Sequence, residues 1–168
     1  MFYTTAIEEF THGMTPKTRL MGLDLGTKTI GLAVATLSIG IASRLTTIRR
    51  TKFQSDAREL MDIIRKEHID GLVLGLPLNM DGTEGPRAQS TRAFARNLAP
   101  FAPPPILLWD ERLSSVAADE KMIAEGVSRT KRSERIDAVA AEVILQSALN
   151  KLLDAYDDMH PHTTVYQK

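Results

Sequence analysis

The hydrophobic pattern opens with two apolar runs of strand length, residues 20–25 and 30–35, joined by a Gly-Thr-Lys-Thr turn. Asp24 lies inside the first run, although aspartate is rare in strands and seldom buried without a partner. Because side chains alternate along a strand, Asp24 shares its face with Gly22 and Gly26, which predicts open space beside the carboxylate. A cation, a water or a phosphate could fill that space. Alternatively, Asp24 accepts hydrogen bonds from the turn.

The rest of the chain alternates between strand-like and helix-like patterns. An alternating, β-branched stretch predicts a third strand, and short continuous apolar runs predict two buried parallel strands. Apolar residues at helical spacing predict the helices. After the first two strands, the expected elements are a strand at 40–49, a helix from Ser55 or Asp56 to His68, a strand at 71–77, a helix at 88–98, a strand at 106–109, a helix from Ser114 or Ser115 to Glu125, a basic loop at 128–135 and a long helix at 136–156.

This order of elements predicts one α/β domain. The first three strands should be antiparallel, and the last two should run parallel to the first, because each is reached through a crossover helix. We therefore expect a five-stranded mixed sheet with helices on both faces.

The domain should span residues 20–157, between a mobile N-terminal extension (1–19) and a polar tail (158–168). The extension lacks an apolar run, so we expect neither a signal peptide nor a membrane segment. A cytoplasmic protein with no membrane partner is therefore expected.

Composition narrows the possible chemistry. Lys plus Arg equals Asp plus Glu at 21 each, so any nucleic-acid binding must come from a local basic patch. The chain has no cysteine, which excludes thiolate metal sites and favours hard metals with oxygen ligands. Its four histidines show no ligand spacing.

Three acidic residues occupy positions where a carboxylate is costly: Asp24 within a strand, Glu111 just after the last strand, and Asp137 on the apolar face of the long helix. The carboxyl ends of parallel strands line one edge of a sheet, so the three could converge there on a metal ion. Each has an ordinary alternative. Glu111 could be an exposed acid paired with Arg112, and Asp137 a first-turn acid favoured by the helix dipole.

Four motifs between residues 20 and 153 resemble one known family, the YqgF-type pre-16S rRNA nucleases, which are Holliday-junction-resolvase-like members of the ribonuclease H superfamily. The motifs are Gly22-Leu-Asp-Leu-Gly-Thr-Lys-Thr-Ile-Gly-Leu-Ala-Val34, Leu74-Gly-Leu-Pro-Leu-Asn-Met-Asp-Gly82, Asp110-Glu-Arg112 and Arg135-Ile-Asp-Ala-Val-Ala-Ala141. The resemblance implies a ribonuclease H-like fold.

The resemblance also implies a catalytic triad of Asp24, Glu111 and Asp137 that binds one or two Mg²⁺ or Mn²⁺ ions. It implies hydrolysis of phosphodiester bonds in structured nucleic acid, either in maturation of the 5′ end of precursor 16S ribosomal RNA or in resolution of branched DNA. The ribosome is then a candidate partner, and the protein could be a monomer or a homodimer, since cutting both strands of a junction requires two active sites.

Basic residues near the expected site are candidates for phosphate contacts. A basic loop directly precedes Asp137, although it could equally be an ordinary solvated loop. The candidate nucleic-acid-binding residues are Lys28, Arg112, Arg129, Lys131, Arg132 and Arg135.

Two other classes of function remain open at the level of sequence. The Asp-x-Gly-Thr turn also occurs in actin-like nucleotide-binding proteins, but these close a cleft between two such domains, and this chain supplies one. A non-catalytic nucleic-acid-binding module of ribosome assembly would keep the fold without turnover.

Overall fold

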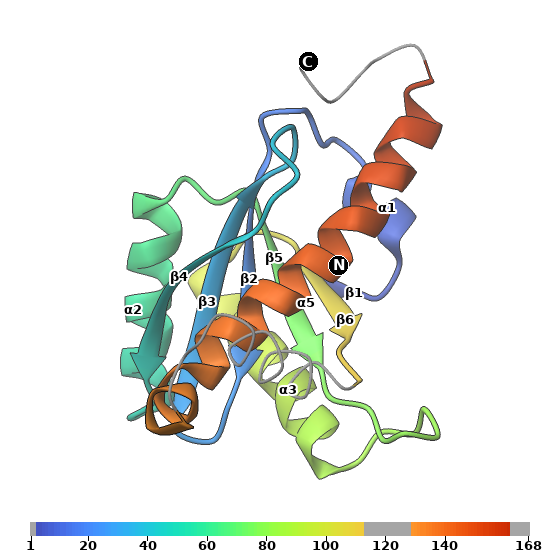
Figure 1. Ribbon diagram of the computed structural model, residues 1–168. Helices are drawn as coiled ribbons and strands as arrows, with labels where there is room; N and C mark the ends of the chain where they lie inside the picture. The colour runs from blue at the N-terminus through green and yellow to red at the C-terminus, as the bar shows by residue number, and fades with distance from the viewer. Residues whose placement is uncertain (1–2, 113–128, 162–168) are drawn as a thin grey trace.

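The computed structural model describes the backbone of residues 3–112 and 129–161, with side chains in the last helix described from residue 138 onward (Figure 1). The strands are β1 (Tyr3–Thr4), β2 (Arg19–Leu25), β3 (Thr29–Thr36), β4 (Ser43–Arg49), β5 (Gly71–Leu76) and β6 (Ile106–Asp110). The helices are α1 (Ile7–Thr11), α2 (Phe53–Lys66), α3 (Pro86–Asn97) and α5 (Arg129–Met159), with a short 3₁₀ turn at Ala99–Phe101.

The described strands form one mixed sheet in the order β1-β6-β5-β2-β3-β4. Strands β2, β3 and β4 pair antiparallel, whereas β5 and β6 run parallel to β2. The predicted mixed α/β architecture, with three antiparallel strands followed by two parallel ones, is therefore confirmed. The expected number of five strands is wrong, because residues 3–4 form a sixth strand that pairs parallel with β6.

The residues predicted to be an N-terminal extension contribute to the domain. After β1, helix α1 places Phe10 in the core, where 6% of its surface is exposed. The Thr11 hydroxyl lies 3.5 Å from the sulfur of Met159 at the far end of α5. The other predicted domain boundaries stay predictions.

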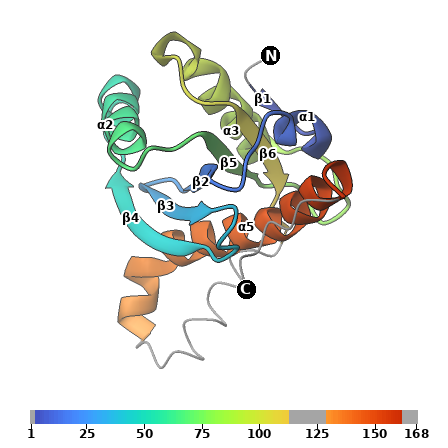
Figure 2. The ribbon, with the colours of Figure 1, turned by 90° about the horizontal axis from the view of Figure 1, so that it is seen from above.

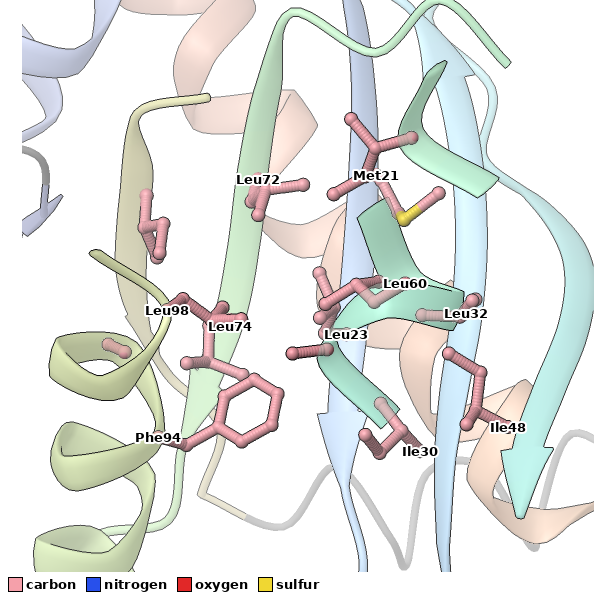
Figure 3. Packing of buried hydrophobic residues seen from close by; sticks show 14 of the residues in the cluster. Met21, Leu23, Ile30, Leu32, Ile48, Leu60, Leu72, Leu74, Phe94 and Leu98 are labelled. Carbon is pink, nitrogen blue, oxygen red and sulfur yellow. The ribbon is translucent and has the colours of Figure 1, made fainter. Parts of the chain in front are cut away.

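The helices cover the two faces of the sheet unequally. Figure 2 shows α2 and α3 on one face and α5 along the other. Under α2 and α3, one side of every central strand contributes large apolar residues, drawn in Figure 3. Those labelled are Met21, Leu23, Ile30, Leu32, Ile48, Leu60, Leu72, Leu74, Phe94 and Leu98. The opposite face of β2 carries Leu20, Gly22 and Asp24, and α5 packs there.

Helix α5 lies directly on the backbone of β2 at Gly22. A Cβ atom at Gly22 would stand 2.7 Å from the Cβ of Leu145 and 2.9 Å from the carbonyl oxygen of Ala141. The expectation that Gly22 leaves open space beside Asp24 is therefore wrong: the helix fills it. A glycine is needed here because no side chain fits between strand and helix.

Polar contacts fix α5 against the antiparallel hairpin. Glu142 forms an ion pair with Arg44 of β4, with 2.8 Å between Nε of the arginine and Oε2 of the glutamate. The Gln146 side chain accepts a hydrogen bond from the backbone of Ala42 and donates one to the carbonyl of Gly40. These contacts fix the middle of α5 against the start of β4.

Two predicted boundaries differ from the structure. Residues 129–135, predicted as a basic loop, belong to the first turns of α5. Lysine, arginine and glutamate are good helix formers, so a charged stretch can be helical although it has no apolar pattern.

Helix α2 begins at Phe53. Lys52 precedes it and provides no capping side chain. The predicted cap Asp56 instead lies in its first turn and accepts hydrogen bonds from Thr51. The helix predicted at 114–125 lies outside the described residues.

Candidate active site

Asp24 lies near the carboxyl end of β2, 7% exposed, on the face that α5 covers. Glycines flank it on both neighbouring strands. Gly31 of β3 is paired directly opposite Asp24. Gly75 of β5 lies at the same level on the other side, one residue beyond the parallel pair Leu23–Leu74. The space beside the Asp24 carboxylate is therefore provided by glycines of the two neighbouring strands, and not by the glycines along β2 as the sequence predicted.

Glu111 uses the space above Gly75. Its backbone N–H donates to the carbonyl of Leu76 (3.2 Å), which extends the β6–β5 pairing by one residue. Its buried Oε2 lies 2.2 Å from the position that a Cβ atom on Gly75 would occupy, and Cδ1 of Ile144 lies 2.8 Å from the same position. The carboxylate of Glu111 therefore stands in place of the missing side chain of residue 75.

This arrangement brings two of the predicted ligands together. Side chains at the same level of adjacent strands start about 5 Å apart, so Asp24 and a group above Gly75 are neighbours. Two carboxylates at this separation can share a hard divalent cation, and their donor chemistry fits Mg²⁺ or Mn²⁺. Among residues 3–112 and 138–161, no group of three possible ligands gathers, so the described part of the chain supplies two of the three expected carboxylates.

The backbone of α5 places position 137 at the same edge of the sheet. Ala141 contacts Gly22, and Asp137 precedes Ala141 by one turn of the helix. Figure 1 shows that α5 begins at the edge of the sheet where β2 and β5 end, so α5 and β2 run in opposite directions. The turn before Ala141 thus lies toward Asp24. The side chain of Asp137 lies outside the described residues, and its role as a ligand stays a prediction.

Arg112 pairs with Asp110 rather than with Glu111. Its Nη2 and Nε donate to Oδ2 of Asp110 at 2.6 and 2.9 Å. The Arg112 hydrogen bonds hold the pKa of the Asp110 carboxyl below its usual range, so this exposed pair persists into mildly acidic solution. The alternative that Glu111 is an exposed acid paired with Arg112 is therefore wrong.

The predicted nucleic-acid-binding residues divide into two groups. Lys28 is exposed in the turn between β2 and β3, at the same edge as Asp24, and Arg112 is exposed beside Glu111. The side chains of Arg129, Lys131, Arg132 and Arg135 lie outside the described residues, although their backbone forms the start of α5.

Three residues near the site could not be identified from the sequence. Gly31 and Gly75 flank Asp24, but only the register between strands reveals them. Arg50 follows β4 and holds the turn after Asp24: its backbone N–H donates to the carbonyl of Lys28 (2.8 Å), and its Nη1 donates to the carbonyl of Gly26 (2.5 Å). No local pattern links Arg50 to a turn more than twenty residues earlier.

The loop after β5 is held by its own polar groups. Leu78 and Glu84 form an antiparallel bridge, and Asp81 accepts hydrogen bonds from the backbone and hydroxyl of Thr83. Met80 is 68% exposed at its tip. Arg112 lies within 3.5 Å of the Met80 carbonyl, so this loop borders the candidate site.

Comparison with known proteins gives consistent matches. The model of one family, described as RuvX: Holliday junction resolvase, matches residues 18–151. The chain is 56% identical over 146 residues to a protein of Paracoccus denitrificans named “Putative pre-16S rRNA nuclease”, covering 87% of this chain and 92% of that protein. A Rhizobium johnstonii protein of the same name is 51% identical, with coverages of 87% and 89%.

Among solved structures, the chain is similar to Thermus thermophilus RuvC in complex with a Holliday junction substrate, with 15% identity and a TM-score of 0.48 over 80% of this chain and 96% of that one. It is also similar to the fowlpox virus Holliday junction resolvase, with 11% identity and a TM-score of 0.44 over 85% and 99%. No helix in the described ranges is long and apolar enough to cross a membrane.

Proposed function

The chain belongs to the RuvX family, whose model covers most of its length, and on this premise we propose that it is a divalent-metal-dependent nuclease that matures the 5′ end of precursor 16S ribosomal RNA. The observation that carries the proposal is the meeting of Asp24 and Glu111 above Gly75 at the carboxyl end of the parallel strands. The names of its relatives support the RNA substrate. The description of the family supports branched DNA as the second candidate.

In the proposed mechanism, the chain supplies rigid oxygen ligands. Asp24, Glu111 and Asp137 would hold one or two Mg²⁺ or Mn²⁺ ions. When bound by these carboxylates, such ions would supply an activated water for attack on a phosphodiester and positive charge to stabilise the leaving oxygen. Burial of Asp24 in β2 and of Glu111 Oε2 over Gly75 fixes the direction of both carboxylates, while Lys28 and Arg112 stand exposed at the same edge to meet phosphates.

The proposed setting follows from the substrate. A nuclease that trims precursor ribosomal RNA acts in the cytoplasm of a bacterial cell, with the immature ribosome as its partner. A monomer suffices for trimming RNA, whereas resolving a junction calls for a homodimer.

The direct test is cleavage of two labelled substrates, a precursor 16S RNA fragment and a four-way DNA junction, with Mg²⁺, with Mn²⁺ and with a chelator. We expect metal-dependent cleavage of the RNA fragment. Cleavage of the junction alone would favour the second candidate. Absence of cleavage of both substrates with either ion would refute the nuclease proposal and favour a non-catalytic assembly module.

The role of Asp137 can be separated from that of an ordinary helix acid by Asp137→Ala. As a metal ligand, Asp137 contributes to ion binding, so the variant should lose metal-dependent turnover. Mn²⁺ should raise the melting temperature of the wild type much more than that of the variant, because a ligand that binds only the folded state stabilises it. The measurements are thermal unfolding with and without Mn²⁺ and the cleavage assay.

The opposite outcome has an equally clear form. If Mn²⁺ stabilises wild type and Asp137→Ala equally and activity survives, Asp137 is not a metal ligand. The alternative of a first-turn acid favoured by the helix dipole is wrong, because α5 begins at Arg129 and Asp137 lies in its third turn, beyond the reach of that effect. The site would then consist of Asp24, Asp110 and Glu111.

The basic start of α5 is testable by the double variant Arg129→Ala, Arg132→Ala. If these residues contact phosphates, nucleic-acid binding should weaken while Mn²⁺ stabilisation of the protein persists. The slope of log K against log salt should flatten by roughly 1–2 units, since each phosphate contact releases about one counterion. Fluorescence anisotropy at several salt concentrations measures this slope, and an unchanged slope would assign the two arginines to solvent.

A further inference from the structure

A small cavity lies on the other side of β2 from the candidate metal site. It measures about 180 Å³ and lies between the turn after β2, the residue after β4 and the first two turns of α3. The residues that line it include Leu25, Gly26, Arg50, Arg87 and Ser90. Of these residues, only Leu25 and Gly26 belong to one of the four sequence motifs.

The walls of the cavity carry positive charge and hydrogen-bond donors but no carboxylate. Arg50 and Arg87 both line it, together with Thr27, Ser90 and Thr91. The hydroxyl of Thr91 already donates to the carbonyl of Arg87, which leaves the hydroxyls of Thr27 and Ser90 as donors. Neither arginine forms an ion pair with an acid in the part of the chain that the structure describes. The first turn of α3 contains no acidic residue. An electropositive cavity of this composition suits an anion with several oxygens.

Arg50 is positioned before any ligand arrives. Its backbone N–H donates to the carbonyl of Lys28, and its guanidinium donates to the carbonyl of Gly26. The second bond holds the guanidinium against the turn, which removes part of the entropy that a free arginine would lose on binding. Within the described residues, the Arg87 side chain makes no hydrogen bond. It is exposed on α3, so it can reach an anion from the opposite wall.

The cavity is adjacent in sequence and in space to the proposed catalytic carboxylate. Leu25 follows Asp24 in β2, and consecutive side chains point to opposite faces, so the cavity and the metal site share one strand end. A polyanion that passes over the carboxyl end of β2 would meet both. The exposed Thr27 and Lys28 lie on the path between them.

We propose that this cavity binds a backbone phosphate of the nucleic-acid substrate, at a nucleotide other than the one that is cut. The proposal rests on the proposed nuclease function for its choice of ligand, but binding in the cavity does not require a metal ion. Its role is to fix the register of the strand, since phosphate contacts position a nucleic acid without reading its sequence.

The test uses two matched pairs of variants on α3. Arg87→Ala removes a cavity arginine, and Arg96→Ala removes an exposed arginine from the last turn of the same helix. Ser90→Glu places a negative charge in the cavity wall, and Gln89→Glu places the same charge on the adjacent exposed residue outside it. All four changes leave the buried residues of α3 intact, and thermal unfolding confirms folding.

Binding is measured by fluorescence anisotropy in chelator, with a labelled RNA fragment and a labelled four-way junction as probes. We expect Arg87→Ala to weaken binding about 3- to 10-fold and to flatten the salt slope by about 0.7–0.9, the value for one phosphate contact. Ser90→Glu should weaken binding more than 10-fold. Arg96→Ala and Gln89→Glu should stay within about 3-fold of wild type. With cleavage restored by metal, KM should rise and kcat should change little.

Two results would overturn the cavity proposal. The first is equal nucleic-acid binding by the two members of each pair of variants. The second is thermal stabilisation by inorganic phosphate with no effect of Arg87→Ala on nucleic-acid binding, which would assign the cavity to free phosphate. Failure of the nuclease proposal looks different. In that case no substrate is cut with any ion, yet the contrast within each pair persists in chelator and supports the cavity as a phosphate site.

Discussion

Asp24→Asn is expected to abolish phosphodiester hydrolysis while the protein remains folded. The amide has nearly the size of the carboxylate but lacks the charge that holds a divalent ion between β2 and Glu111. We expect turnover to fall by at least about 10³-fold, as for other single charged groups at the centre of an active site. Without divalent ions, the melting temperature should stay equal or rise, because neutralising one of two neighbouring carboxylates relieves their repulsion.

The matched control is Asp56→Asn. Asp56 is as buried as Asp24, at 4% exposed, but it accepts hydrogen bonds from the backbone and hydroxyl of Thr51 at the start of α2. Its replacement should lower stability and leave turnover per folded molecule unchanged. The readouts are the cleavage rate with Mg²⁺ or Mn²⁺ and thermal unfolding. Cleavage by Asp24→Asn at the wild-type rate would show that Asp24 is not a ligand.

Gly75→Ala should remove most activity by displacing Glu111. The new methyl group would stand 2.2 Å from Oε2 of Glu111, far inside contact distance, so the carboxylate must leave its position. The atoms that yield are the ends of two side chains, Glu111 and Ile144, so the fold should persist at a cost of about 1–3 kcal/mol. We expect turnover to fall about 10²-fold, the order seen when one preorganised electrostatic contact of an active site is lost, together with a smaller stabilisation by Mn²⁺.

Gly71→Ala is the control on the same strand and the same face. Its methyl group would approach the ring of Phe10 (2.9 Å) and Cδ2 of Leu20 (3.0 Å), which are also side-chain ends. The packing cost should therefore be similar, but the site at the other end of β5 is untouched. If both variants lose activity in proportion to their loss of stability, Gly75 has no specific role in placing Glu111.

The sequence was sufficient to identify those candidate site residues that are unusual among their immediate neighbours in the chain. Asp24 interrupts an apolar strand, and Glu111 follows one, so each could be identified from its immediate neighbours. Gly75 and Gly31 could not, because their importance depends on which strands pair and in what register. A one-residue shift between β2 and β5 would place Leu74 or Leu76 beside Asp24 instead.

The sequence did not predict β1 or the first turns of α5, because neither segment has a regular spacing of apolar residues. Strand β1 has two residues, too few for an alternating pattern, and is defined only by its pairing with β6. The charged residues 129–135 suggested a loop because they lack an apolar stripe, yet they continue a helix whose stability comes from the packing of its later turns.

Because β1 pairs with β6, the sheet can be completed only after most of the chain has been synthesised. Tyr3 lies opposite Ile106, so β1 leaves the ribosome about 100 residues before its partner strand. Closing a chain segment of that length costs about 4 kcal/mol of entropy, more than a two-residue strand can offset. Phe10 and Thr11, which pack against the core and α5, must supply the rest. Pulse-labelled hydrogen exchange should accordingly show the amides of β1 and α1 becoming protected after those of β2 and β3.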